Sequence, residues 1–238
     1  MRGDETSFVV FGYFDFKELE HLYSIRAPSY LILDLVGEDG DVEITSWEGE
    51  IDLRTEDGDI DLVDIRAPTT RLSAEDGDLT VERLIGRLTV TAEDADVRIT
   101  DCTLSDARIR LEDGDATLLR CEGSGQFDLA DGTVALERFR PDGVRIRTED
   151  GDVDLDLLPS PTMDVTVRTG DGDVTIDLAP GSSTRFTIDT RDGAIRLDAP
   201  QATDVSRRES RLSGRLGAGE GELRVESGDG RVTLRHSE

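Results

Sequence analysis

The chain has 238 residues, of which 54 are acidic and 27 basic, so that its net charge is −27. This balance argues against nucleic acid and anionic membranes as partners, because phosphate binding needs a basic surface, and no stretch approaches the ~20 apolar residues of a membrane span. Lys17 is the only lysine. A dense carboxylate surface with almost no lysine is typical of salt-loving microbes, although a GC-rich genome also favours arginine over lysine.

Residues 1–30 precede the repeated part of the chain and are rich in aromatic residues. They include four of the seven phenylalanines and all three tyrosines. We expect this segment to be an N-terminal cap that covers the exposed core of the first coil, as the ends of repeat proteins require. It lacks the apolar core of a signal peptide. The chain as written is therefore predicted to be cytoplasmic, or to lie at the surface or be secreted if a leader has been removed.

Residues 31–238 repeat one pattern ten times, and each copy is centred on the second residue of an Asp-Gly pair or its equivalent. The interval between centres is nearly constant as far as Gly151, slightly longer for the next two steps, and almost doubled before Gly230. A fixed period of roughly 20 residues indicates a solenoid. The centres are Gly40, Gly58, Gly77, Ala95, Gly114, Gly132, Gly151, Gly172, Gly193 and Gly230.

Three columns of apolar residues accompany these centres. The residues two and four positions after each centre, and five positions before it, are apolar in every copy, for example Val97, Leu118 and Phe127. Charged residues and threonine alternate with them, which is the period-2 pattern of strands with one buried face. The sequence therefore predicts an all-β fold, a parallel β-solenoid of about ten coils that is right-handed by the rule for parallel crossovers.

Aspartates flank the centres on both sides. The leading aspartate column, immediately before the centres, contains Asp39, Asp57, Asp76, Asp94, Asp113, Asp131, Asp150, Asp171, Asp192 and Asp229. The trailing aspartate column, immediately after them, contains Asp41, Asp59, Asp78, Asp96, Asp115, Asp152 and Asp173. One interpretation is structural, since a corner aspartate accepts hydrogen bonds from nearby backbone N–H groups. The alternative is loose binding of Ca²⁺ or Mg²⁺, with Asp57, Asp59, Asp76 and Asp78 as candidate ligands.

No cofactor is expected otherwise, because the calcium-binding nonapeptide and the complete EF-hand pattern are both absent. The glycines at the centres are expected to adopt positive φ, which costs glycine little. Ala95 should either strain its corner or adopt a different turn.

Cys102 and Cys121 occupy the same position in two consecutive copies of the repeat, seven places after the centre. The same column holds Trp47, Ile65, Leu84, Phe139 and Leu158. We expect both thiols to fill this core column as small apolar side chains, while their position in adjacent coils also leaves a disulfide open.

Residues 201–222 interrupt the repeat. This segment contains the one basic cluster of the chain, Arg207, Arg208, Arg211 and Arg215. It is predicted to be an irregular insertion: either a degenerate coil or a hairpin that folds back over the open C-terminal end. The cluster is either a solvated loop or a contact patch for an acidic surface, such as a protein partner or the aspartate columns of another copy.

The columns, together with Thr-Glu-Asp-Gly-Asp-Ile-Asp-Leu at 55–62 and Thr-Glu-Asp-Gly-Asp-Val-Asp-Leu at 148–155, resemble a known family. Its members are bacterial and archaeal β-strand-repeat proteins of unknown function, labelled adhesins or Toastrack domains. The resemblance covers residues 30–238 and implies a parallel β-solenoid with no catalytic residues. Some members are linked to cell-envelope stress signalling beside membrane segments, which this chain lacks.

The sequence therefore predicts a non-enzymatic structural or interaction module in envelope-associated regulation or adhesion. Neither a Ser-His-Asp set nor a nucleophile elbow, phosphate loop or histidine metal site is found. A first alternative is a polymer-forming element similar to bactofilins, which polymerise end to end. A weaker alternative is a β-helix enzyme that acts on carbohydrates.

Overall fold

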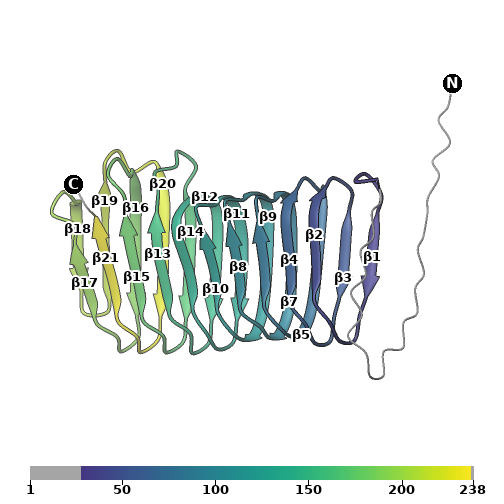
Figure 1. Cartoon of the computed structure of the whole chain (residues 1–238). Helices are drawn as coiled ribbons and strands as arrows, with labels where there is room; N and C mark the ends of the chain where they lie inside the picture. Colours follow the sequence, from purple (N-terminus) through teal and green to yellow (C-terminus); the bar gives the residue numbers. More distant parts are fainter. Residues whose placement is uncertain (1–27, 237–238) are drawn as a thin grey trace.

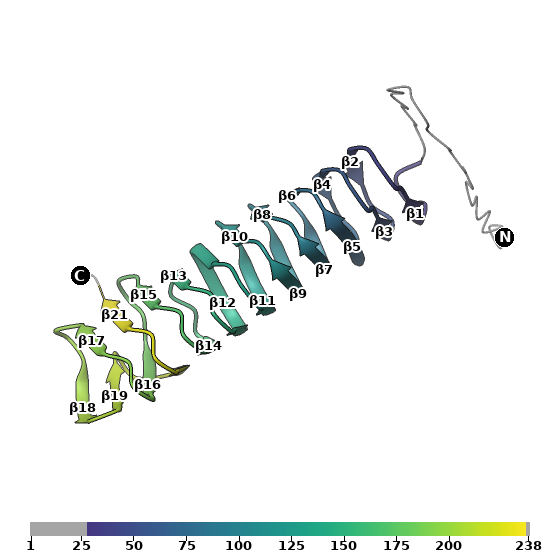
Figure 2. The same cartoon turned by 90° about the horizontal axis from the view of Figure 1, so that it is seen from below.

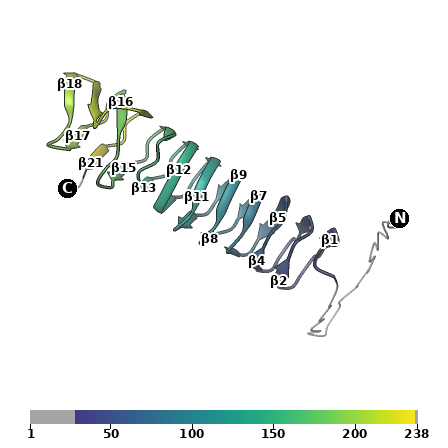
Figure 3. The same cartoon turned by 90° about the horizontal axis from the view of Figure 1, so that it is seen from above.

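The computed structural model describes residues 28–236, and all of the regular elements in that range are β-strands (Figure 1). The strands form a rod with two layers, which Figures 2 and 3 show from opposite sides. Residues 1–27, which make up most of the predicted N-terminal cap, lie outside the described residues.

The upstream sheet consists of the strands that lead into the centres of the repeat. In spatial order it contains β1 (Leu33–Val36), β3 (Ile51–Arg54), β5 (Thr69–Asp76), β7 (Ile85–Asp94), β9 (Thr103–Asp113), β11 (Glu122–Leu129), the second half of β12 (Val134–Thr148), β14 (Asp164–Thr169), β20 (Gly221–Ser227), β16 (Thr184–Thr190), β19 (Arg211–Leu216) and β18 (Thr203–Arg208).

The downstream sheet consists of the strands that leave the centres. In spatial order it contains β2 (Val42–Trp47), β4 (Ile60–Ile65), β6 (Leu79–Glu82), β8 (Val97–Thr100), β10 (Ala116–Leu119), the first half of β12, β13 (Val153–Leu157), β15 (Val174–Leu178), β21 (Val232–His236) and β17 (Ile195–Asp198).

The register of these strands places equivalent residues of successive coils side by side. Val97 pairs with Ala116, which pairs with Val134, and all three side chains are buried between the sheets. Burial of a continuous apolar stripe is the dominant stabilising term for such a stack. The predicted all-β parallel solenoid is confirmed, and its handedness stays a prediction.

The C-terminal coil lies out of sequence order. β20 pairs with β14 on one side and β16 on the other, and β21 lies between β15 and β17. In Figure 1 these two yellow strands therefore stand among green ones. Residues 221–236 fill a slot, one coil wide, between the coil of β14 and β15 and the coil of β16 and β17. About eight turns follow one another along the chain, fewer than the ten that the spacing predicted.

Residues 203–216 form an antiparallel hairpin, so of the two predicted alternatives the structure has the hairpin. β19 pairs with β16, and β18 lies beyond it at the edge of the upstream sheet. Leu212 and Leu216 are buried, whereas every residue of β18 is exposed. A register shift and the positive φ of Asp204 (53°) distort this edge strand. Such irregularity and the charged side chains of β18 oppose the pairing of another strand.

The centres form two kinds of corner. Gly58 has φ +124°, as predicted, and a Cβ there would also lie 2.5 Å from the carbonyl oxygen of Gly40. Gly151 lacks a positive φ, yet a Cβ would overlap the carbonyl oxygen of Gly132. The prediction of positive φ is therefore wrong at some centres, where lack of space between stacked backbones requires glycine. These centres are Gly151, Gly172, Gly193 and Gly230.

At each corner of the second kind, a hydroxyl three residues before the centre forms a hydrogen bond with the centre residue. Thr148 donates a hydrogen bond to the carbonyl oxygen of Gly151 (3.0 Å), and Thr190 donates to that of Gly193 (2.9 Å). Ala95 has no positive φ and is buried, so it adopts a different turn, as one of the two predictions stated.

Candidate interaction surfaces

The four arginines of the predicted basic cluster lie on both faces of the β18–β19 hairpin. Arg207 pairs across the hairpin with the buried Leu212, and its Nη1 donates to the carbonyl oxygen of Ile195 on β17 (3.3 Å). Arg208 pairs with Arg211 on the opposite, outer face. The cluster is therefore not one continuous patch.

Two of these arginines have intramolecular partners. Arg211 forms an ion pair with Asp189 (3.4 Å), and Arg215 with Asp204 (2.9 Å). Both pairs are exposed, and exposed pairs contribute ~0–1 kcal/mol each. Because these charges are already paired, the hairpin offers less free positive charge than its sequence indicates.

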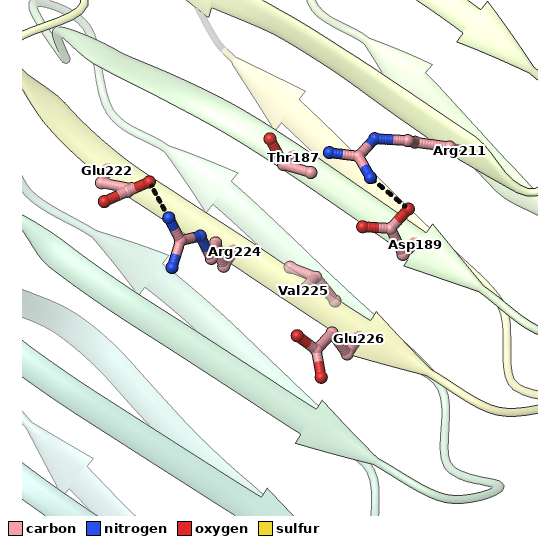
Figure 4. Close-up of a pocket in the computed structure, with 7 residues that line it drawn as sticks. All are labelled: Thr187, Asp189, Arg211, Glu222, Arg224, Val225 and Glu226. Atoms are coloured by element: carbon pink, nitrogen blue, oxygen red, sulfur yellow. Dashed lines mark hydrogen bonds and ion pairs between the residues drawn. The ribbon is translucent and has the colours of Figure 1, made fainter.

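Two shallow depressions lie on the outer face of the upstream sheet beside this hairpin. One is lined by Ser206, Arg208, Arg211 and Ser213. Figure 4 shows the other, which is lined by Thr187, Asp189, Arg211, Glu222, Arg224, Val225 and Glu226. Four of its charged side chains pair with one another, since Arg224 contacts Glu222 at 2.7 Å and Arg211 contacts Asp189, while Glu226 pairs with Arg168 on β14. Both depressions are open and polar rather than enclosed.

Among residues 28–236, every member of the trailing aspartate column except Asp78 ties its coil to a neighbouring coil. The Asp59 carboxylate accepts a hydrogen bond from the backbone N–H of Asp78 (2.9 Å), and Asp41 accepts from that of Asp59 (3.1 Å). Asp96, Asp115, Asp152 and Asp173 accept equivalent bonds. This is the predicted structural role, except that each donor belongs to the neighbouring coil instead of the same turn.

The leading aspartate column has no such role among residues 28–236. All of its side chains are exposed, and none of them accepts a hydrogen bond or forms an ion pair there. Asp57 and Asp76 belong to this column, whereas Asp59 and Asp78 belong to the trailing one. In the same range, no three His, Cys, Asp or Glu side chains are grouped so as to hold a metal ion.

Sequence reasoning missed a third ladder, six residues after the centres. Its members have left-handed backbone conformations with φ between 51° and 60°. They are Ser46, Asp64, Arg83, Asp101, Arg120 and Arg138. The signal in the sequence is a residue that is polar in the first six copies of the repeat and comes directly before a buried column residue such as Ile65 or Leu84.

Opposite charges alternate along this ladder from Asp64 to Arg120. Arg83 Nε lies 2.6 Å from Asp64, and Arg120 forms a bidentate pair with Asp101 (2.7 and 2.8 Å). Hydrogen bonds from these arginines hold the pKa of Asp64 and of Asp101 below the ordinary value, and the same bonds raise the pKa of each arginine. Such bidentate pairs fix the side chains as a row along one edge of the rod.

Cys102 and Cys121 are both buried and free, as the core-column prediction required. The sulfur of Cys102 accepts the backbone N–H of Leu84 (3.2 Å), and that of Cys121 accepts the N–H of Cys102 (3.4 Å). The contact with Cys121 and burial raise the pKa of the Cys102 thiol. The column prediction is wrong at its far end, because Leu157 and not Leu158 pairs with Phe139.

A family model described as Toastrack DUF4097 matches residues 50–235 of this chain. The comparisons with curated proteins and with solved structures found no match. The described part of the chain offers no long apolar helix of the kind that crosses a bilayer.

Proposed function

Because the chain belongs to the Toastrack family, we propose that it is a non-catalytic interaction module, a rigid solenoid that binds a protein partner through its outer surfaces. The observation that supports this role is the register of the two sheets. It holds outward side chains at the strand spacing of ~4.8 Å over the whole described length. For example, Arg108, Gln126 and Arg145 lie side by side on three neighbouring strands. A partner meets a surface that is ordered before it binds, which lowers the entropic cost of association.

The finer setting that we propose is envelope-associated regulation or adhesion, which the resemblance to β-strand-repeat proteins implies. The rod would there act as a spacer or docking surface rather than as a catalyst.

End-to-end polymerisation is the less favoured alternative. A filament of this kind needs two bare ends that fit each other. At the C-terminal end, the β18–β19 hairpin covers the upstream sheet with an exposed, irregular strand, and Arg207 binds the free edge of β17. These features oppose the stacking of a further coil.

Affinity capture with the immobilised full chain tests the proposal. A specific partner should be retained in a saturable manner and displaced by the free chain, and contact sites should map to the outer surfaces. Because Lys17 is the only lysine, cross-linking has to use carboxylates. Absence of any saturable partner, or turnover of an acidic glycan by the purified protein, would contradict the proposed role.

A further inference from the structure

One outer face of this acidic rod carries an excess of arginine. From β5 to β20, one row of the upstream sheet alternates arginine with uncharged side chains and contains no acid, whereas on β3 and β1 the same row begins with Asp52 and Asp34. In register, the part without acid consists of Arg71, Thr89, Arg108, Gln126, Arg145, Thr166 and Arg224. Since neighbouring strands lie ~4.8 Å apart, successive arginines in this row are roughly 10 Å apart.

The adjacent row, nearer the corners, reinforces this charge. It consists of Ser73, Thr91, Arg110, Asp128, Arg147 and Arg168. We call the two rows together the arginine face.

Only part of this positive charge is neutralised within the molecule. Four arginines of this face have acidic partners: Arg108 contacts Asp106 at 3.1 Å, Arg147 approaches Asp128 at 4.0 Å, Arg168 contacts Glu226 at 2.9 Å and Arg224 contacts Glu222 at 2.7 Å. Arg71, Arg110 and Arg145 are exposed and form no ion pair with any residue of the range 28–236. These three guanidinium groups remain available to an external anion.

The leading aspartate column presents the complementary charge. Its carboxylates have no partner among the described residues, unlike those of the trailing column. They also follow the coil repeat, since Asp39 pairs in register with Asp57, Asp76 with Asp94, and Asp94 with Asp113. Glutamates such as Glu56, Glu75 and Glu93 directly precede these aspartates and add to the negative edge.

From these two surfaces we infer that the rod associates side by side with a second copy, whose leading aspartate column lies on the arginine face. This inference rests on the proposed interaction role and names the partner. The same coil stacking generates both surfaces, so the arginines of the first row recur at every second coil and the leading aspartates at every coil. Each arginine of that row therefore meets the aspartate column at the same phase, which a partner of different spacing would not allow. The face and the edge are different surfaces of one rod, so the contact can repeat from copy to copy.

Salt controls this association in a characteristic way. Each copy has a net charge of −27, so long-range repulsion opposes contact when salt is low. The Debye length falls from ~10 Å at 0.1 M to ~3 Å at 1 M. Added salt therefore removes the repulsion between whole rods first, while pairs in direct contact are weakened less. Self-association should increase from low salt to a maximum and decline only at higher concentrations.

Sedimentation velocity of the full chain across a series from about 0.1 to 2 M NaCl tests this inference. The variant Arg110→Ser/Arg145→Ser removes two unpaired charges from the arginine face and should raise the dissociation constant of self-association at least tenfold. The matched control is Arg98→Ser/Arg196→Ser. These arginines are exposed on the outer face of the downstream sheet, also without an ion pair in the described range, and the change in net charge is identical.

An exchange of charges between the two surfaces distinguishes loss of the contact from loss of folding. The variants Arg110→Asp/Arg145→Asp and Asp94→Arg/Asp113→Arg should each associate weakly alone and recover association when mixed. A wild-type chain that stays monomeric throughout the salt series would overturn the inference, as would equal losses in the two serine variants. If such a monomer still captures another protein in a saturable manner, the interaction role survives without self-association.

Discussion

Replacement of Gly151 by alanine tests whether backbone crowding determines the glycine column. Gly151 has no positive φ, so alanine there carries no penalty for backbone conformation. An added methyl group would instead overlap the carbonyl oxygen of Gly132 in the preceding coil. Gly181 provides the opposite case, with φ +88° and no neighbour closer to a methyl group than Pro159 Cγ at 3.8 Å.

The two variants should differ in magnitude. For Gly181→Ala we expect a loss of about 1 kcal/mol in the free energy of unfolding, the cost of a left-handed residue with a Cβ. Overpacking costs about 1–3 kcal/mol and occasionally more. The obstacle at Gly151 is backbone, which cannot rotate away as a side chain can. Gly151→Ala should therefore cost about 3 kcal/mol or more, because the coils must separate locally.

Urea unfolding followed by far-ultraviolet circular dichroism, in about 1 M salt to screen the acidic surface, measures both losses. The midpoint should fall further for Gly151→Ala than for Gly181→Ala. A loss at Gly151 equal to or smaller than that at Gly181 would refute the crowding argument and leave backbone conformation as the explanation.

Three further outcomes are expected. The carboxylate of Asp101, with its lowered pKa, stabilises the fold above pH ~4 and loses this contribution as pH falls through the lowered value. The melting temperatures of wild type and Asp101→Asn should therefore converge in acid. The control variant Asp61→Asn, at a residue without an ion pair in the described range, should not show this convergence. Arg138→Gly should raise the unfolding free energy by about 0.5 kcal/mol, since it relieves φ 51° at a residue without an ion pair among residues 28–236, and a loss in urea titration would contradict this. Wild-type stability should rise between ~0.1 and ~1 M salt, because salt screens the repulsion between surface carboxylates. A flat response would show that this repulsion does not destabilise the fold.

The sequence was sufficient to predict the coil and its interior. Each coil has the same apolar positions, so Val97, Leu118 and Leu136 could be aligned without knowledge of the structure. The period also placed the two cysteines in a core column, because apolar residues hold that position in the neighbouring copies of the repeat. These are local patterns that repeat, and a parallel stack makes each of them a contact between neighbouring coils.

The order of the last coils could not be predicted from the same pattern. The interior of the coil formed by β20 and β21 resembles that of every other coil, so burial alone favours no single slot. Contacts outside the core distinguish the slot: Glu226 pairs with Arg168 (2.9 Å), and Arg235 with Asp177 (3.4 Å). These pairs join residues 58 positions apart, and a repeat the length of one coil gives no indication of them.

The surfaces were predicted less well than the core because charge in sequence does not indicate which charges remain unpaired in space. Arg211 and Arg215 stood out as a cluster but have acidic partners on neighbouring strands. Arg110 and Arg145 attract no attention in the sequence, and only the register brings them to one face.

The slot filled by residues 221–236 has a consequence for the order in which the molecule can be built. During synthesis the earlier turns can stack as they emerge, but β16 and β17 have no finished layer to rest on until residues 221–236 have been synthesised. Completion of the rod therefore waits for this segment. The same arrangement matters under mechanical load: tension on the chain that follows β21 would extract an internal layer and detach everything beyond it, instead of peeling the outermost turn.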